Sequence, residues 1–324
     1  MPVLDPVSPQ GLASAHLLVA ILLIGAGIFL LVAGWTLVNV VRFRYRPGQG
    51  EPYQDFGRRK LELTWTIAPA VLLVIIFVFT LKAMGDAEPS GASTSLIPAL
   101  VSVDGALPDA PRPDLIVTGE QWWWEVKYPQ TGVVTANEIY LPVGKRLLVQ
   151  LESDDVIHSL WIPSLGPKVD LVPGQTNYMW LEADRPGTYL GQCSEFCGTA
   201  HAWMRIDAIA VSQAQFESWR QQQLQPAPAP ISAQAMAGAR FFQSNTCVDC
   251  HAIAGTPANA HIGPDLTHFA SRHQIAGGVL DNTPQNVAKW LQAPNQIKPE
   301  VHMPTYHLTD ADLAALTAYL ETLK

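Results

Sequence analysis

Sulfur and nitrogen side chains gather in one short loop of the 324-residue sequence, where their types suit metal binding. The loop holds two thiols, an imidazole and a thioether, and a further imidazole lies upstream: Cys193, Cys197, His201, Met204 and His158. Thiolates and imidazoles are common protein ligands of zinc and copper. Without a metal, the two cysteines could instead form a disulfide or serve as small buried apolar side chains.

The choice between zinc and copper depends on ligand number and softness. The two thiols and two imidazoles could bind one zinc ion in tetrahedral geometry. That arrangement leaves Met204 without a role, because a thioether is a soft ligand that suits copper. Two bridging thiolates, one imidazole per metal and a weak axial group on each metal would use all of the donors. The loop therefore predicts a dinuclear copper centre.

A second motif, Cys247-Val-Asp-Cys250-His251, has the C-x-x-C-H spacing that attaches haem covalently. The two thiols would form thioether bonds to the haem vinyl groups, and His251 would bind the iron. A thiol–disulfide role is disfavoured because no βαβ pattern surrounds the motif, and a zinc site would need another pair of ligands. The motif therefore predicts a c-type haem domain.

A sixth iron ligand has to come from elsewhere in the chain. Met303, which is followed by Pro304, is the first candidate, and His302 competes with it directly. Three further histidines are weaker candidates: His261, His268 and His273. Ligation by histidine and methionine raises the haem potential toward values that suit electron transfer.

The composition indicates which elements must position these motifs. Apolar residues make up 48% of the chain and charged residues only 15%, so part of the chain is expected in lipid. Four cysteines are too few for a disulfide scaffold. The formal net charge of −8 argues against nucleic acid as a partner.

Two apolar segments predict a transmembrane hairpin. Leu17 to Val41 contains no charged residue and is long enough to cross a bilayer as a helix. The second segment, Trp65 to Leu81, places Pro69 in its first turns, where a missing backbone donor costs least. The connecting loop, 42–64, holds six basic and three acidic residues. We therefore expect the loop on the cytoplasmic side and both chain ends outside.

Composition divides the chain into six expected segments: an external N-terminal segment (1–16), the hairpin (17–82), a linker (83–112), a β-sandwich (113–212), a helix with a Pro-rich spacer (213–230) and an all-helical domain (231–324). Short apolar runs broken by turn residues predict strands in the sandwich at Leu115–Thr118, Trp122–Val126, Leu147–Leu151, Tyr178–Leu181 and Ile206–Val211. A polar helix is expected over 213–223 and a final helix around Leu316.

The Cys-x3-Cys-x3-His-x2-Met loop with its upstream histidine resembles the dinuclear copper (CuA) centre of cytochrome c oxidase subunit II. The resemblance extends to Glu62-Leu-Thr-Trp65-Thr-Ile-Ala-Pro69, Gln121-Trp122-Trp123-Trp124, and Lys168-Val-Asp170 with Pro173-Gly174. Residues 231–324 resemble class I cytochrome c in Gly263-Pro264-Asp265-Leu266, Met303-Pro304 and Ala318-Tyr319-Leu320. The combination looks like subunit II of a caa3-type oxidase, with a cupredoxin-like sandwich.

The resemblance implies a role for each copper-site residue. Cys193 and Cys197 would bridge the two coppers, and His158 and His201 would be terminal ligands. The axial ligands would be Met204 and the backbone carbonyl of Glu195. The Glu195 side chain would also contact a magnesium ion at the boundary with subunit I.

Two further roles and the iron ligand come from the same resemblance. Trp122 matches the tryptophan through which electrons reach the copper centre, although a core or interface aromatic is an equal alternative. Glu62 matches a carboxylate at the mouth of a proton channel in subunit I, although it could simply be solvated. Met303 would be the axial ligand of the haem.

The resemblance implies the electron-accepting subunit of a proton-pumping terminal haem–copper oxidase in a bacterial cytoplasmic membrane, with both globular domains on the periplasmic side. Electrons would pass from a soluble or membrane-bound cytochrome c, or another donor, through haem c and CuA to the haems of subunit I. Subunit I, subunit III and lipid are the expected partners. Two alternatives are a CuA-containing subunit of a nitric oxide reductase and a membrane-anchored copper-delivery or electron-carrier protein. Direct quinol oxidation is disfavoured, because the quinol-oxidising relatives lack the copper ligands.

Overall fold

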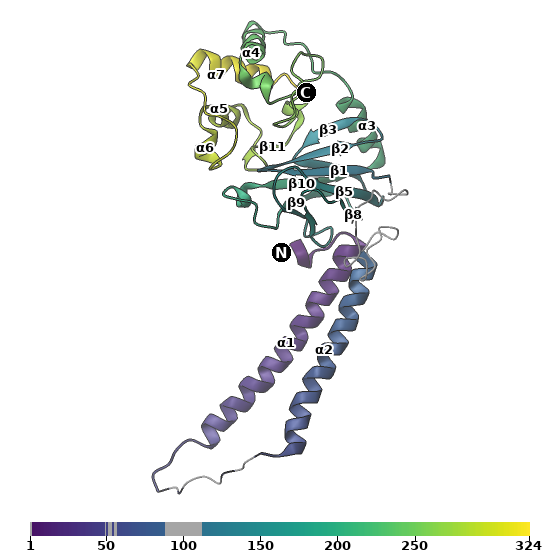
Figure 1. Ribbon diagram of the computed structural model, residues 1–324, viewed down its shortest axis with the longest axis vertical. Helices are drawn as coiled ribbons and strands as arrows, with labels where there is room; N and C mark the ends of the chain where they lie inside the picture. Colours follow the sequence, from purple (N-terminus) through teal and green to yellow (C-terminus); the bar gives the residue numbers. More distant parts are fainter. Residues whose placement is uncertain (1, 49, 51–53, 55–56, 88–111) are drawn as a thin grey trace. The chain divides into compact units, whose positions relative to one another are not determined.

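The computed structural model describes residues 2–48, 50, 54, 57–87 and 112–324. The chain forms two structural units (Figure 1). One unit comprises 12–87, and the other combines the N-terminal residues up to Gly11 with the described chain from residue 112 onward.

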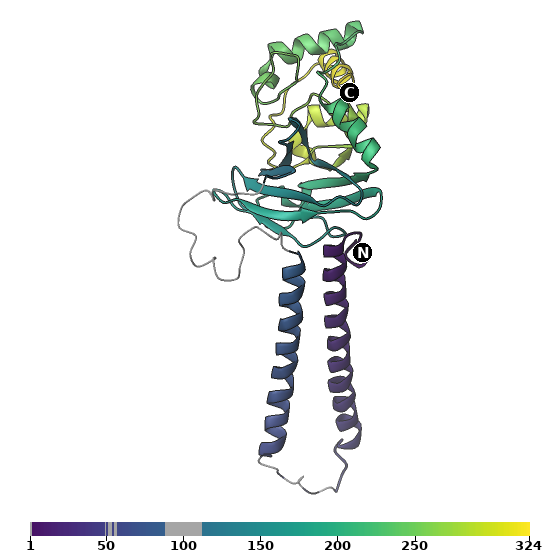
Figure 2. The same cartoon turned by 90° about the vertical axis from the view of Figure 1, so that its right-hand side faces the viewer.

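The first unit is a pair of long apolar helices, α1 (Pro9–Arg42) and α2 (Arg59–Ala87). Both are long and apolar enough to cross a bilayer. They run side by side in both views (Figures 1 and 2). Glu62 lies in the first turn of α2 with its side chain exposed. The expected helical hairpin is therefore present.

The helix bounds differ from the expected ones. The first helix begins at Pro9, where proline suits the first turn, and Ser8 Oγ accepts a hydrogen bond from the Gly11 N–H at 2.9 Å. The prediction for Pro69 is wrong, because α2 already begins at Arg59 and Pro69 lies in its interior. The polar residues before Trp65 are good helix formers, so the helix starts before the apolar stretch. Of the expected linker 83–112, residues 83–87 are helical and 88–111 lie outside the described residues.

The second unit contains a sandwich of two five-stranded sheets, ordered β3-β2-β1-β5-β8 and β4-β10-β9-β6-β7. The strands are β1 (Leu115–Glu120), β2 (Trp123–Tyr128), β3 (Val133–Ala136), β4 (Glu138–Pro142), β5 (Leu147–Ser153), β6 (His158–Trp161), β7 (Val169–Leu171), β8 (Asn177–Leu181), β9 (Gly187–Cys193) and β10 (Arg205–Val211). The β1–β5 and β4–β10 pairs are parallel, and the other pairs are antiparallel. All five predicted strands are present, and five more accompany them.

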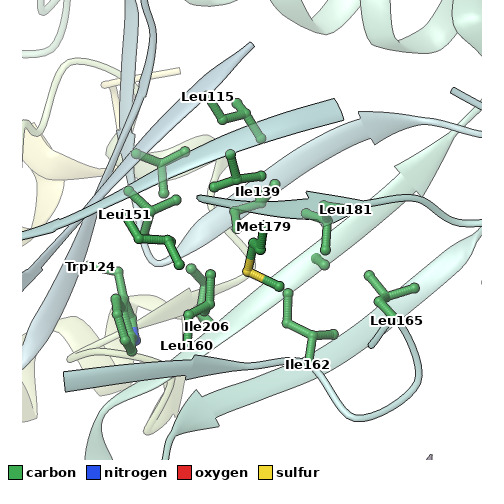
Figure 3. Packing of buried hydrophobic residues seen from close by; sticks show 14 of the residues in the cluster. Leu115, Trp124, Ile139, Leu151, Leu160, Ile162, Leu165, Met179, Leu181 and Ile206 are labelled. Atoms are coloured by element: carbon green, nitrogen blue, oxygen red, sulfur yellow. The ribbon is translucent and has the colours of Figure 1, made fainter. Parts of the chain in front are cut away.

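The sandwich core lies between the inner faces of the two sheets (Figure 3). Alternate residues of β1, Leu115 and Val117, are fully buried, as the period of two along a strand requires. Trp124 of β2 and Leu160 of β6 pack into the same cluster. Full burial of each such side chain contributes roughly 1.5–3 kcal/mol. The N-terminal residues join this domain, since the Val7 N–H donates to the Ser164 carbonyl at 2.9 Å.

Helix α3 (Gln213–Gln223) matches the predicted polar helix. It begins with a capping box in which Ser212 and Gln215 each satisfy the other's backbone N–H. Trp219 packs against the sandwich and stacks on Tyr140, with ring centroids 4.3 Å apart. The prolines that follow, up to Pro230, lie in a segment without regular structure. This short spacer leads to the C-terminal domain.

The C-terminal domain is mainly helical, with α4 (Ala233–Ser244), α5 (Pro284–Gln292), α6 (Pro294–Ile297) and α7 (Asp310–Leu320). A two-stranded hairpin, β11 (Gln274–Ile275) with β12 (Leu280–Asp281), is an addition to the all-helical prediction. Helices α4 and α7 cross at Gly238, where a Cβ atom would lie 2.0 Å from the Ala315 carbonyl oxygen. Only glycine permits this close approach of the two backbones.

We predict that Gly238→Ala destabilises the C-terminal domain, because the added methyl group must push α4 away from the backbone of α7. Overpacking of this kind typically costs about 1–3 kcal/mol. Thermal unfolding of the purified chain, followed by haem absorbance, measures the loss. The exposed Gln234→Ala on the same helix is the control. Equal unfolding temperatures for the two variants would contradict the close-packed crossing.

Candidate copper and haem sites

The sulfur-rich loop connects β9 to β10 at one end of the second sheet. Cys193 is the last residue of β9, and His158 is the first residue of β6. These strands are neighbours, with Leu160 opposite Cys193, so the pairing brings the His158 ring next to the loop. The Cys193 N–H donates to the Met204 carbonyl at 2.9 Å, which closes the loop across its base.

All five predicted donor side chains come together at this loop: four belong to the loop or its ends, and His158 reaches it from β6. The two cysteine Sγ atoms lie 3.7 Å apart and are not bonded to each other. His158 Nδ1 lies 3.8 Å from Cys193 Sγ, and His201 Nδ1 lies 3.5 Å from Cys197 Sγ. Met204 Sδ lies 3.9 Å from Cys197 Sγ. Each thiol thus has its own imidazole, an arrangement that fits two metals bridged by sulfur.

A backbone carbonyl adds a further donor to the set. The carbonyl oxygen of Glu195 lies 3.3 Å from Cys193 Sγ. The ligand atoms of His158 and both cysteines fall within 4.8 Å of one another, and all three residues are buried. Soft thiolate and thioether donors with imidazoles in a water-poor site suit copper. The described residues therefore fit the predicted copper centre.

Hydrogen bonds among the donor side chains shift the pKa values of both thiols and of His158. The hydrogen bond shared with Cys197 is the largest cause lowering the pKa of Cys193, which falls to about 3, and the same bond raises the pKa of Cys197. Burial acts to lower the pKa of His158, but hydrogen bonds to Asp155 and Cys193 outweigh it and raise this pKa to about 9. One thiol therefore ionises easily, and thiolate is the form that binds metal.

Two residues that support His158 were missed by sequence reasoning. Asp155 Oδ1 lies 2.8 Å from His158 Nε2, which leaves Nδ1 toward the sulfur and sets the orientation of the ring. Gly119 of β1 lies under the ring, because a Cβ there would come within 2.7 Å of His158 Cδ2. The Asp155-Val-Ile-His158 spacing could have indicated the first contact. The second joins distant segments and has no local signal.

Trp122 lies against the loop that holds the proposed copper ligands. Its indole N–H donates to the Cys197 carbonyl at 2.9 Å, and Gln121 Nε2 donates to the same oxygen at 2.7 Å. The side chain is 4% exposed. Trp122 also lines the cavity of the C-terminal domain, so one residue borders both candidate sites.

That cavity has a volume of about 520 Å³ and surrounds the C-x-x-C-H motif. Cys247, Cys250 and His251 line it, together with apolar side chains such as Leu316. His251 Nδ1 lies 2.7 Å from the Pro264 carbonyl oxygen, so Nδ1 donates there and Nε2 is left as a metal ligand. Gly263 is required next to the ring, since a Cβ would come within 2.8 Å of His251 Cε1.

Three features of the cavity test whether a haem fits it. Its lining is mostly apolar, as a porphyrin requires, and both cysteines of the motif are free thiols. Arg272 also lines it, and its buried Nε has no hydrogen-bond partner among the described residues. A haem propionate would satisfy that donor, because buried polar groups normally have partners. The cavity therefore suits haem c.

The structure reduces the candidates for the sixth iron ligand to two. Met303 and His302 both line the cavity. His268 is buried elsewhere, with Nε2 near the Gln223 and Gln225 carbonyls at 3.2 and 3.1 Å. His273 and His261 are exposed, outside the cavity lining. The His302 ring is tilted against Trp122 with centroids 5.4 Å apart, so it points toward the copper domain.

The structure also locates two of the acidic residues near these sites. The exposed Glu195 carboxylate pairs with Lys168, with Oε2 and Nζ 3.1 Å apart. Glu120 lines the cavity, and burial, followed by repulsion from Asp154, Asp155 and Glu125, raises its pKa to about 7. The His158 charge opposes this shift. Glu120 therefore gains its negative charge at a higher pH than an ordinary glutamate.

The fold and the two sites define a class of protein: a membrane-anchored electron-transfer protein with a copper-type sandwich and a c-type haem domain. Family models match the chain at 2–83 (cytochrome c oxidase subunit II, transmembrane domain), 131–211 (cytochrome c oxidase subunit II, periplasmic domain) and 235–324 (cytochrome c).

Relatives match the chain over most of its length. Cytochrome c oxidase subunit 2 of Alkalihalophilus pseudofirmus is 35% identical over 99% of this chain and 90% of its own. The subunit 2 of Bacillus sp. strain PS3 is 33% identical over 87% of this chain and 80% of its own. A crystal structure of the periplasmic domain of subunit II of Bradyrhizobium japonicum cytochrome oxidase is 34% identical, covers 35% of this chain and 95% of that one, and has a TM-score of 0.33.

The chain belongs to the cytochrome c oxidase subunit II family and carries a C-terminal cytochrome c domain. Membership implies CuA copper in the sandwich and haem c in the C-terminal domain. It also implies a membrane-anchored subunit of an oxidase complex with its globular domains outside. The predicted family, fold class and membrane attachment are confirmed.

We predict that Glu120→Gln changes how stability depends on pH. With a folded-state pKa near 7 and an unfolded value near 4.5, the folded chain binds more protons between these values. Glu120 therefore makes stability fall as pH rises from about 4.5 to 7, and the Gln variant should lose this contribution. Urea unfolding across that range measures the effect, and the exposed Asp184→Asn is the charge-matched control. A pH profile identical to the parent's would contradict the shift.

Proposed function

We propose that the chain is the electron-accepting subunit of a terminal oxidase, and that its copper loop holds the CuA pair. Cys193 and Cys197 would bridge the two coppers, with His158 and His201 as terminal ligands. Met204 and the Glu195 carbonyl would be the weak axial ligands. The support is the pairing of each thiol with its own imidazole at 3.8 and 3.5 Å. When bound, the copper pair supplies reversible one-electron exchange.

We assign haem attachment to Cys247 and Cys250, and proximal iron ligation to His251. Met303 is the proposed distal ligand, because the His302 ring packs on Trp122 and Met303 lines the cavity beside it. The Pro264 carbonyl holds the His251 tautomer that such ligation needs. Histidine and methionine ligation suits an electron carrier of raised potential.

The single observation that carries the proposed function is the position of Trp122. Its side chain borders the haem cavity, while its indole N–H donates to the carbonyl of the proposed copper ligand Cys197. Trp122 is therefore the proposed route from the haem domain to the copper loop. Because one chain carries both sites, their effective concentration is high and transfer needs no new encounter.

Beyond the chain, we propose transfer from the copper loop to the haems of subunit I, where oxygen is reduced to water and protons are pumped. Glu195 would contribute its carboxylate to magnesium at that boundary, in place of the present pairing with Lys168. The exposed position of Glu62 at the start of α2 is compatible with a proton-channel mouth. The proposed partners are subunits I and III, lipid, and a soluble or membrane-bound cytochrome c or other donor.

Metal analysis of the isolated chain tests the copper assignment. We expect two coppers per covalent haem after copper reconstitution, because the loop offers two imidazole–thiol sets. Cys193→Ser should lose the dinuclear copper spectrum while keeping covalent haem. A copper-to-haem ratio of one, or zinc binding in preference to copper, would defeat the dinuclear assignment. Oxygen and nitric oxide consumption by the chain with its native partners then distinguishes an oxidase from a nitric oxide reductase.

A pair of substitutions tests the haem ligand. Met303→Leu keeps the side-chain volume but removes the thioether, so we expect a high-spin or ligand-exchanged haem spectrum with the copper spectrum unchanged. His302→Leu should leave the haem low-spin. The absorption spectrum of the reduced protein reports both outcomes. If only the His302 variant changes the spectrum, the assignment of Met303 is wrong.

A further inference from the structure

The segment from Lys298 to Met303, between α6 and α7, contacts the copper domain at alternate residues. Lys298 is 2% exposed, and its side-chain nitrogen donates to the backbone carbonyl of Trp122. It also donates to the Ala276 carbonyl at 3.1 Å. Ion pairs recorded for the described part of the chain include none to Lys298, so its amine is held by carbonyl oxygens. Burial lowers the pKa of Lys298 to about 7, and the charge of Cys197 opposes this shift. Burial without a carboxylate is costly, which favours a specific role.

Two residues further along, Glu300 contacts the copper loop itself. Its Oε2 accepts a hydrogen bond from Thr199 Oγ1 at 2.6 Å, and Thr199 lies between Cys197 and His201. Glu300 has a φ of +60°, in the left-handed region that favours glycine. A non-glycine residue there is strained by about 1 kcal/mol or more. The glutamate side chain at this position makes the contact with the loop.

His302 makes the third contact, with its ring against that of Trp122 at 5.4 Å between centroids and 49° between planes. The next residue, Met303, lines the haem cavity. One peptide unit therefore separates the proposed iron ligand from a ring that touches Trp122. Trp122 in turn donates to the Cys197 carbonyl.

A second part of the C-terminal domain rests on the same face of the sandwich. The turn between β11 and β12 brings Gly277 and Gly278 against it, and the Gly277 carbonyl accepts the Arg205 N–H at 2.9 Å. A Cβ at Gly278 would come within 2.8 Å of Arg205 Cβ. Nearby, the His273 N–H donates to the buried Glu138 carboxylate at 2.7 Å. These contacts restrict the haem domain to one orientation.

We propose that Lys298, Glu300 and His302 are positioning residues for internal electron transfer, which hold the haem domain against Trp122 and the copper loop. This inference rests on the proposed function. In the transfer, ferrous haem becomes ferric as one electron is gained by the oxidised copper pair, and no bond or proton changes place. The three side chains neither bind metal nor carry the electron, and their effect is to keep the two domains docked.

The test uses the full chain loaded with copper and haem, and two independent measurements. Hydrogen–deuterium exchange at the Arg205 amide reports docking, because that N–H bonds to Gly277 of the other domain. Photoreduction of the haem by a ruthenium complex, followed at the copper absorbance, reports internal transfer. We expect Lys298→Met and Glu300→Gly each to increase amide exchange and slow transfer roughly tenfold, as the loss of one such hydrogen bond implies.

The choice of variants separates docking from folding. Glu300→Gly removes the contact with Thr199 but relaxes the left-handed backbone, so its thermal stability should be kept. Glu300→Gln keeps an acceptor for Thr199 and should restore most of the rate. His302→Phe keeps a ring against Trp122, whereas His302→Leu should slow transfer with the haem spectrum unchanged. Lys289→Met, at an exposed lysine of α5, is the matched control and should behave as the parent.

The outcomes distinguish this inference from the function on which it rests. If the parent lacks bound copper or shows no internal transfer, the proposed function fails, while amide exchange still measures docking. If the parent transfers electrons but the Glu300→Gly and Lys298→Met variants match it in both rate and exchange, the positioning role is overturned. Slower transfer accompanied by a change in the haem or copper reduction potential would also overturn the positioning role, because a positioning residue does not change these potentials.

Discussion

Two sulfur atoms must lie within bridging distance of each other, and the strand pairing at this end of the sandwich meets that requirement. The loop between β9 and β10 brings the Sγ atoms to 3.7 Å, and the pairing of β6 with β9 adds the first imidazole. Buried thiols this close cannot both ionise readily, so one thiol holds its proton while the other loses it. A metal pair relieves the conflict, because thiolates bind metal in their charged form. The hydrogen bond to the Asp155 carboxylate and the space left by Gly119 then fix the orientation of the His158 ring.

The haem domain depends on the same loop from the other side. Trp122 joins the two sites, since it borders the cavity and donates to the backbone of the copper loop. The segment from Lys298 to Met303 brings together the proposed iron ligand and the contacts to Trp122 and Thr199. A short proline-containing spacer precedes the domain and limits how far it can move, at about 3 Å per residue. Docking is thus favoured by the covalent connection as well as by the contacts.

Much of the chemistry could be predicted from the sequence, because the donors lie close together along the chain. The loop from Cys193 to Met204 and the C-x-x-C-H motif are local patterns, and both converge in space as expected. Helix bounds were less predictable: α2 continues through polar residues before Trp65, so Pro69 falls in its interior. Lipid-buried helices tolerate such a proline because neighbouring groups satisfy the freed carbonyl.

Long-range contacts account for most of what sequence reasoning missed. Short strands such as β6 and β7 contain too few residues to show a clear alternation. Lys298 and Trp122 are separated by 176 positions, and no local pattern indicates that the buried lysine would contact the Trp122 carbonyl. The same holds for Glu300 and Thr199, which are 101 positions apart. Which domain surfaces meet is decided by shape and by paired polar groups, and one sequence does not display either.

The burial of Trp122 has a consequence for the order in which carriers act. Trp122 is only 4% exposed, because it joins the sandwich core and has the His302 ring of the haem domain against it. A visiting carrier would therefore meet the porphyrin-binding module first. Under the proposed function, electrons would then reach the haem of the fused domain first and the copper centre second.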